Sequence, residues 1–162
     1  MILTACRSIE AREAVWSEFD LTNGVWTIPK ERMKAGRQHI VPLSSRALEI
    51  VTELSESRPG EYVFCHAGHG KPYSVNAPRA LLKRMGRDET LHGFRATFKS
   101  WATDKTMTQR EVIEMALAHK VGNEVEASYL RTSAIEKRRA LMESWSNHCK
   151  VKGTGDVVLL HG

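Results

Sequence analysis

Cysteine is scarce in this chain, and long apolar runs are absent. Three cysteines, Cys6, Cys65 and Cys149, are scattered over 162 residues, an odd number that does not suit a disulfide framework. No apolar run comes near the roughly 18 residues that a membrane-spanning helix needs, and the first residues do not resemble a signal peptide. These absences lead us to expect a protein of a reducing cytoplasm with no membrane partner.

A strong overall charge bias is also missing, since 24 Lys and Arg stand against 19 Asp and Glu, a net charge of +5. The surplus is uneven, because residues 71–110 contain nine Lys or Arg and only three acidic residues. Such a segment suits a nucleic-acid partner, although solvated helix faces account for many charge runs of this kind. Hydrophobic residues make up 41% of the chain, which predicts one folded domain with a real core.

The residue pattern predicts short strands and several helices. Residues 25–28 and 38–41 have strand composition, with a basic loop between them and a turn at Asn23-Gly24, and residues 62–64 are a third strand candidate. Residues 16–21 are predicted to be a connection. Ser133 and Thr108 each have Glu three residues later, a capping-box pattern that predicts helix starts. The ranges predicted to be helical are 2–15, 44–57, 76–85, 92–105, 108–118, 124–130 and 133–148.

Six residues supply a chemically coherent set: Arg7, Lys34, His92, Arg95, His119 and Tyr129. Two guanidiniums can hold the non-bridging oxygens of a phosphodiester and neutralise the charge that builds in the transition state. A lysine can protonate the departing oxygen, and a histidine can take the proton of an attacking tyrosine. The set therefore suits attack on a phosphodiester by a tyrosine without a metal ion.

Each of these signals is weak alone. His92 and Arg95 are three residues apart and so share a helix face, but a capping histidine and a solvated arginine would give the same pattern. Gly122 allows the chain to turn and bring Tyr129 back toward His119, yet a tyrosine on an amphipathic helix is usually packing. Most loop lysines such as Lys34 are merely solvated.

Other constellations are less convincing. Cys65, His66 and His69 lie close together, but three ligands on a glycine-rich loop with this spacing fit no common zinc site. Gly68-x-Gly70 is too short to cradle a phosphate. We therefore expect neither a metal nor a cofactor.

Taken together, the motifs resemble those of the tyrosine recombinases, the phage-type integrases, over roughly Ile2 to Cys149. The family pattern is an Arg before a short Ser/Gly-Glu turn, a Lys on a hairpin, His-x-x-Arg, a Leu-Gly-His-like segment and a Tyr about ten residues later. The matching stretches here are Arg7-Ser-Ile-Glu10, Lys34, His92-Gly-Phe-Arg95, Leu117-Ala-His119 and Tyr129. Ile9 replaces a small residue and Ala118 replaces the common Gly, departures that concern packing more than chemistry.

The resemblance implies an α+β fold, mostly helical, with a small antiparallel three-stranded sheet. It implies a catalytic domain over residues 1–149, truncated at its N-terminal side, and a tail at 150–162 that includes a docking strand at 157–160. The family normally has further helices and an N-terminal helical domain before the first Arg.

The resemblance also implies a mechanism and partners. Tyr129 would attack the phosphorus and form a 3′-phosphotyrosine, Arg7 and Arg95 would bind the phosphoryl oxygens, and His92 would assist the tyrosine proton. Lys34 would protonate the 5′-oxygen, and His119 would hydrogen-bond the phosphate. The implied function is site-specific recombination, the integration or excision of a mobile element in a prokaryotic nucleoid. The implied partner is double-stranded DNA, bound by a tetramer of the full-length protein or by a monomer of this fragment.

Two other functions stay open at this point. One is a catalytically inert DNA-binding fragment, which would bind DNA without forming an adduct. The other is a type IB topoisomerase, which uses the same chemistry on a single duplex and relaxes supercoils as a monomer.

Overall fold

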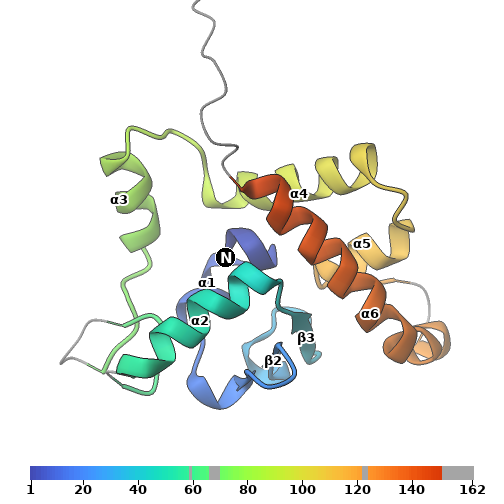
Figure 1. The fold of residues 1–162 in the computed structure, drawn as a ribbon, viewed down its shortest axis with the longest axis horizontal. Helices are drawn as coiled ribbons and strands as arrows, with labels where there is room; N and C mark the ends of the chain where they lie inside the picture. Colours follow the sequence, from blue (N-terminus) through green and yellow to red (C-terminus); the bar gives the residue numbers. More distant parts are fainter. Residues whose placement is uncertain (59, 66–69, 122–123, 151–162) are drawn as a thin grey trace, which may run out of the picture.

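The computed structural model describes residues 1–58, 60–65, 70–121 and 124–150, with side chains described outside 124–133. A small sheet and the short N-terminal helices pack against a set of longer helices (Figure 1). The elements are η1 (Ile2–Thr4), α1 (Ser8–Arg12), η2 (Trp16–Glu18), β1 (Phe19–Asp20), β2 (Val25–Ile28), η3 (Lys30–Arg32), β3 (His39–Pro42), α2 (Ser45–Ser57), α3 (Ala77–Arg84), α4 (Leu91–Lys105), α5 (Arg110–Ala116) and α6 (Glu124–Cys149). The expected α+β class, mostly helical with a three-stranded antiparallel sheet, is confirmed. No helix among these described residues is long and apolar enough to cross a bilayer.

The sheet has the order β1-β2-β3, and both pairings are antiparallel. The two strands predicted around the basic loop are present, but the third strand is not the predicted segment 62–64. Tyr62 makes only an isolated bridge to Val15, whereas β1 pairs with β2 inside the segment predicted to be a connection. The cause is local: the carboxylate of Asp20 accepts from the backbone N–H of Asn23 at 2.9 Å, and Gly24 adopts φ +61°, which folds β1 back onto β2.

Four predicted helices are observed near their expected bounds. The hydroxyl of Ser44 accepts from the backbone N–H of Ala47 and caps α2, and the hydroxyl of Thr90 caps α4 in the same way. The predicted helix over 2–15 is wrong, because Ala5 has a left-handed backbone with φ 48° and separates η1 from α1. Because the helix is broken here, the carbonyl of Ala5 can accept a hydrogen bond from the guanidinium of Arg95.

Both predicted capping boxes are wrong. α5 begins at Arg110 after Gln109, and no side chain caps it. Ser133 lies inside α6, which runs without interruption from Glu124 to Cys149. The apolar residues that follow Ser133 on α6 are deeply buried, and their packing outweighs a local capping preference. Gly122-Asn123 and the tail 151–162, including the predicted docking strand, lie outside the described residues.

Two apolar clusters form the core. One joins α4, α5 and α6 and includes Phe98, Leu117, Leu141, Met142 and Trp145, all at most 3% exposed. The other joins the sheet to α1 and α2 and is centred on Trp26 and Ile28. Trp26 and Trp145 are buried, whereas Trp101 is only partly so.

Polar contacts fix α6 to three other elements. Arg138 donates to the carbonyl of Ile40 in β3 at 2.6 Å, and Glu143 accepts from the backbone N–H of Ser45 at 2.7 Å. Trp145 donates from its indole N–H to the carbonyl of Ile2 at 3.0 Å. α6 therefore lies against the sheet, the start of α2 and the N-terminal segment, and passes α4 and α5 on its way (Figure 1).

Candidate active site

Arg7 stands at the N-terminal end of α1, where its guanidinium is held by an acidic partner. The carboxylate of Glu10 accepts from Nη1 of Arg7 at 2.7 Å and also from the backbone N–H of Arg7 at 2.7 Å. Glu10 is 2% exposed, so this carboxylate is enclosed by the protein. The spacing of three residues creates this geometry on a helical turn, and it orients the arginine without burying it fully.

Arg95 lies in the second turn of α4 and is buried. Its Nη1 donates to the carbonyl of Ala5, and its Nη2 donates to the carbonyl of Leu117 at 2.8 Å. Both carbonyls lie at a helix end with a left-handed residue, Ala5 itself and Ala118 after Leu117, where helical bonding stops and carbonyls need donors. Arg95 thus connects three segments that are far apart in the sequence.

One cavity of about 370 Å³ brings together three of the predicted residues. Arg7, His92 and Arg95 line it, with Ile9 and Leu91 among its apolar neighbours. Burial and the neighbouring guanidinium of Arg7 lower the pKa of Arg95. Two guanidiniums and the one carboxylate of Glu10, which pairs with Arg7, leave an excess of positive charge here, as an anion-binding cavity requires.

Lys34 lies between η3 and β3, exposed at the tip of the β2–β3 hairpin, and lines neither described cavity. The hairpin is fixed by Arg32, two residues earlier. Nη1 of Arg32 donates to the carboxylate of Glu18, and Nη2 donates to the carbonyl of Glu10. Arg32 therefore links the lysine-bearing hairpin to α1, the helix that Arg7 precedes, and it is hydrogen-bonded within the fold, unlike the exposed basic residues nearby.

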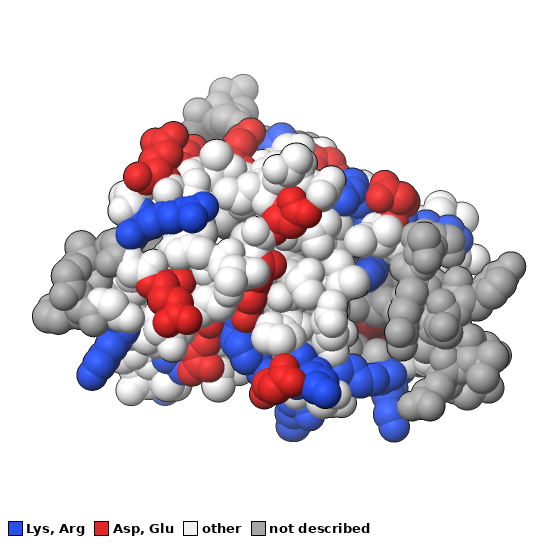
Figure 2. All heavy atoms as spheres, turned by 90° about the horizontal axis from the view of Figure 1, so that it is seen from below, with Lys and Arg blue, Asp and Glu red and all other residues white. Residues whose placement is uncertain are grey.

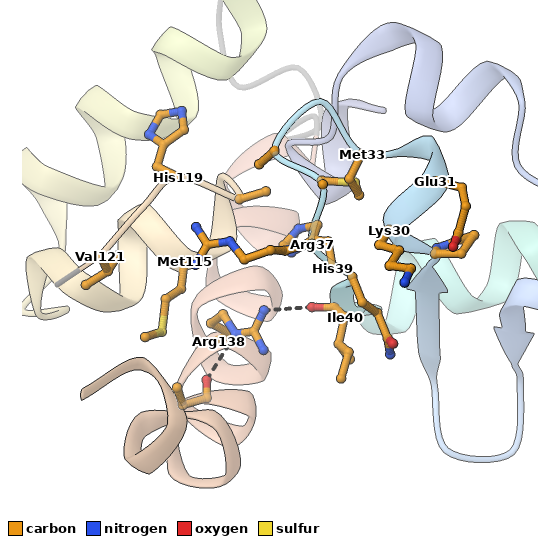
Figure 3. Close-up of a pocket in the computed structure, with 16 residues that line it drawn as sticks. Lys30, Glu31, Met33, Arg37, His39, Ile40, Met115, His119, Val121 and Arg138 are labelled. Atoms are coloured by element: carbon orange, nitrogen blue, oxygen red, sulfur yellow. Dashed lines mark hydrogen bonds between the residues drawn. The ribbon is translucent and has the colours of Figure 1, made fainter. Parts of the chain in front are cut away.

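A larger groove of about 750 Å³ lies between the hairpin and the end of α5. In the view of Figure 3, His119 lies on the α5 side, Lys30 and Glu31 on the sheet side, and Arg37 extends between them. The guanidinium of Arg138 forms part of the lining, where its bond to the Ile40 carbonyl is drawn. This groove and the Arg7 cavity are linked through Arg95, which bonds the residue before Ala118.

His119 follows α5 through a backbone turn of the Schellman type. The backbone N–H of His119 donates to the carbonyl of Glu114 at 2.9 Å, and that of Ala118 donates to Met115 at 3.0 Å, with φ 53° at Ala118. Nδ1 of His119 lies 2.5 Å from Oε2 of Glu114, and Nζ of Lys99 lies 2.6 Å from Oε1. The hydrogen bonds from Lys99 and His119 lower the pKa of the Glu114 carboxyl, Lys99 contributing most.

A second histidine, His39 in β3, is buried at the inner side of the same groove. The pKa of His39 is lowered to about 4, mainly because the ring is buried and secondly because the guanidinium of Arg138 is nearby. His39 is therefore a neutral ring at physiological pH. Sequence reasoning did not single it out, because a histidine inside a short strand carries no local sign of its surroundings.

Tyr129 lies on α6, and its side chain is outside the described part of the structure. The structure thus brings Arg7, His92 and Arg95 to one cavity and His119 to the adjoining groove beside the hairpin of Lys34. Sequence reasoning gave no role to Glu10 or Glu114, and it treated Arg32 as one of the loop cations expected to face the DNA backbone. Of these, only Glu10 had a usable signal, its spacing of three residues from Arg7.

Of the three residues considered as zinc ligands in the sequence, the structure describes only Cys65. Among the residues that the structure describes, no group of three His, Cys, Asp or Glu is placed to hold a metal ion. His66 and His69 lie outside those residues.

Basic residues outside the site are mostly exposed, but they do not form a uniform surface on every side. The face seen in Figure 2 carries acidic side chains among the basic ones. The exposed basic residues of the segment 71–110 are Lys71, Arg79, Lys83, Arg84, Arg87, Lys99, Lys105 and Arg110. The arrangement can attract a polyanion and hold one phosphate group between two guanidiniums.

Comparisons with known proteins agree with this geometry. A family model described as the phage integrase family matches residues 1–136. The prophage integrase IntA of Escherichia coli K12 is 38% identical over 99% of this chain, and the integrase of Enterobacteria phage P4 is 31% identical over 91%. The chain spans only 40% and 38% of the length of these two relatives.

Two solved structures share the fold. The XerA recombinase has a TM-score of 0.58 at 18% identity, over 92% of this chain and 56% of its own. The Tn1549 transposon integrase, in complex with circular intermediate DNA, has a TM-score of 0.56 at 13% identity, over 80% of this chain and 54% of its own. The motifs, the fold and the matched family model together show that this chain belongs to the phage integrase family, the tyrosine recombinases.

Proposed function

We propose that this chain carries the catalytic centre of a site-specific DNA recombinase, which integrates or excises a mobile element by breaking and rejoining double-stranded DNA. The observation that supports it best is the cavity shared by Arg7, His92 and Arg95. The two guanidiniums leave positive charge uncompensated in a partly enclosed space, where a phosphodiester in attack gains a second negative charge. The relatives' names and the DNA complex of the transposon integrase support the same class of substrate.

The proposed first step is a transesterification. The phenolic oxygen of Tyr129 forms a bond to phosphorus, and the bond from phosphorus to the 5′-oxygen breaks, so that a 3′-phosphotyrosine and a free 5′-hydroxyl result. His92 takes the phenolic proton, and Lys34 gives a proton to the 5′-oxygen. Arg7 and Arg95 hold the non-bridging oxygens. No external energy source is needed, because the phosphotyrosine retains one ester bond for each one broken.

Rejoining is the same reaction in reverse, with the 5′-hydroxyl of another strand as the attacking group. Exchange between two duplexes needs four such sites, so we propose a tetramer on DNA for the full-length protein, acting at the bacterial nucleoid. The proposed catalytic domain is 1–149, and the residues 150–162 form the proposed tail. The described anchors of α6 at Arg138, Glu143 and Trp145 support a rigid mount for the helix that bears Tyr129.

Covalent trapping on a nicked duplex tests this function. The substrate carries a nick a short distance 3′ of the scissile phosphate. Cleavage then releases a short oligonucleotide with the free 5′-hydroxyl, which diffuses away, so that religation fails and the adduct accumulates. The chain should form a denaturant-resistant protein–DNA adduct, and Tyr129→Phe should form none while binding DNA as before, because only the nucleophilic oxygen is lost. Tyr62→Phe is the matched control and should retain the adduct.

Three outcomes would point elsewhere. Binding without any adduct would indicate an inert DNA-binding fragment. Relaxation of supercoiled DNA by a monomer would indicate a topoisomerase. An adduct that persists in Tyr129→Phe, or that peptide mapping assigns to Tyr62 or Tyr73, would refute the assignment of the nucleophile.

A further inference from the structure

We infer that Glu114 is a positioning residue for His119: it fixes the ring so that Nε2 is the nitrogen presented to the DNA phosphate. This inference rests on the proposed function, because it assigns the orientation of one of its phosphate ligands. The starting point is the backbone turn at the end of α5. In a Schellman turn the side chains of the third-last helical residue and of the residue after the left-handed one lie against each other. Here these two residues are Glu114 and His119.

The contact between the two side chains dictates where the ring hydrogen lies. Oε2 of Glu114 is 2.5 Å from Nδ1 of His119, and an ionised carboxylate can only accept a hydrogen bond. Nδ1 must therefore carry a hydrogen, and Nε2 is the free nitrogen. His119 is 40% exposed at its side chain and lines the groove beside the hairpin, so Nε2 is open to a ligand.

The carboxylate itself is held in place. Nζ of Lys99 in α4 lies 2.6 Å from its other oxygen, Oε1, and the Glu114 side chain is only 14% exposed. Each oxygen thus has its own hydrogen-bond partner, and together these partners lower the pKa of the Glu114 carboxyl. The carboxylate stays ionised at neutral pH and cannot rotate away without breaking one of the two contacts.

The consequence for the reaction follows from the chemistry of imidazole. With Nδ1–H engaged by Glu114, a neutral His119 presents an acceptor at Nε2, whereas the imidazolium presents a donor. A phosphate oxygen needs a donor, and the adjacent carboxylate compensates the positive charge of the imidazolium. The other charged or titratable groups that line this groove are Lys30, Glu31, Arg37, His39 and Arg138. Arg37, Lys30 and Arg138 outnumber Glu31, so a phosphate is attracted into the groove and in turn favours the charged ring.

Two measurements test the inference, and Glu111→Gln is the matched control for both. Glu111 is exposed on the same helix, and Glu111→Gln removes the same charge as Glu114→Gln. In the first measurement, long-range ¹⁵N–¹H NMR spectra of the free chain report which ring nitrogen of His119 carries the hydrogen. We expect Nδ1–H or the imidazolium in the wild type and in Glu111→Gln, and a shift toward Nε2–H in Glu114→Gln. A wild-type His119 that is a neutral Nε2–H tautomer would overturn the inference.

The second measurement is the rate of adduct formation on the nicked duplex. Glu114→Gln should lower this rate about 10-fold, the lower range for losing a partner that orients a functional histidine, while DNA affinity changes no more than in Glu111→Gln. In a His119→Ala background, Glu114→Gln should have no further effect, because the ring it orients is gone. An equal effect of Glu114→Gln with and without His119, or a rate equal to that of Glu111→Gln, would refute the positioning role. If the wild type forms no adduct at all, the proposed function fails, and the NMR measurement still decides whether Glu114 fixes the ring.

Discussion

Arg95 donates from Nη2 to the carbonyl of Leu117 at 2.8 Å, across 22 positions of sequence. This bond joins the helix that carries the His-x-x-Arg motif to the segment immediately before His119. A second bond of the same guanidinium reaches the carbonyl of Ala5, two residues before Arg7. One side chain therefore sets the relative positions of three predicted site residues, in addition to lining the cavity shared by Arg7 and His92.

The first prediction concerns this dual role. Arg95→Lys keeps the charge but cannot donate to two carbonyls in fixed directions, so it should lower the free energy of unfolding by roughly 1–3 kcal/mol and also reduce adduct formation. Arg95→Ala should in addition weaken DNA binding, because a phosphate ligand is lost. Urea unfolding, with the adduct assay in parallel, measures both effects. Arg79→Lys on the exposed face of α3 is the control and should stay within about 0.5 kcal/mol of the wild type.

The second prediction concerns Ala118, which has φ 53° in the turn before His119. A Cβ in this left-handed conformation costs about 1 kcal/mol, so Ala118→Gly should stabilise the fold by about 0.5–1 kcal/mol, slightly offset by the lost methyl contact. Ala96→Gly, in the exposed interior of α4, should have the opposite sign and destabilise by about 1 kcal/mol. Thermal unfolding compares the two. Equal losses in both variants would show that Ala118 is not strained.

The third prediction concerns the pH dependence of stability. The buried His39 has its pKa lowered to about 4, whereas a histidine in the unfolded chain titrates near 6.5. Between these values the unfolded state binds one more proton than the folded state, so stability falls as pH decreases from about 6.5 to 4, by up to about 3 kcal/mol. Above about pH 6.5 this contribution is fully present.

Urea unfolding at several pH values tests this, with His39→Gln as the comparison. The carboxyl groups titrate in both proteins, so the difference between the two curves isolates His39. That difference should be flat above about pH 6.5 and should change steadily below it. Parallel curves from pH 7 to 4 would show that His39 titrates normally in the folded protein.

The fourth prediction concerns the basic segment 71–110. DNA affinity should fall steeply with salt, about 10³-fold between 50 and 200 mM if roughly six phosphates are contacted. Lys83→Gln on α3 should reduce the slope of log affinity against log salt by about 0.9, the release of one counterion. Arg46→Gln is the comparison, because Arg46 is already paired with Glu49 on α2, at 3.1 Å. An affinity that does not respond to salt would remove DNA from the proposed partners.

Local signals in the sequence predicted much of the fold, and long-range contacts account for what it missed. The Asn23-Gly24 turn, the helical spacing of apolar residues over 44–57 and the motif around Arg95 were visible because they depend on near neighbours. The capping pattern at Ser133 wrongly predicted a helix start, because burial of later residues on α6 keeps that helix continuous.

The supporting residues of the site were beyond sequence reasoning for a similar reason. Arg32 reaches Glu10 across 22 positions, and Lys99 meets Glu114 across a helix–helix contact. Contacts between residues so far apart in the sequence produce no periodic pattern from which they could be predicted. The pairing of Glu114 with His119 depends on a left-handed backbone at Ala118. Alanine rarely adopts this conformation, so the sequence does not predict the turn.

Because α6 is continuous from Glu124 to Cys149, position 129 and the C-terminal contacts of the helix move as one rigid element. Position 129 lies nine residues before Arg138 on the same helix, so it is carried roughly 14 Å beyond that anchor. The described hydrogen bonds that join α6 to other segments all lie on the C-terminal side of position 129, at Lys137, Arg138, Arg139, Glu143 and Trp145. A small tilt of α6 about the strand β3 would therefore displace position 129, the proposed nucleophile, while the C-terminal end of the helix moves the other way.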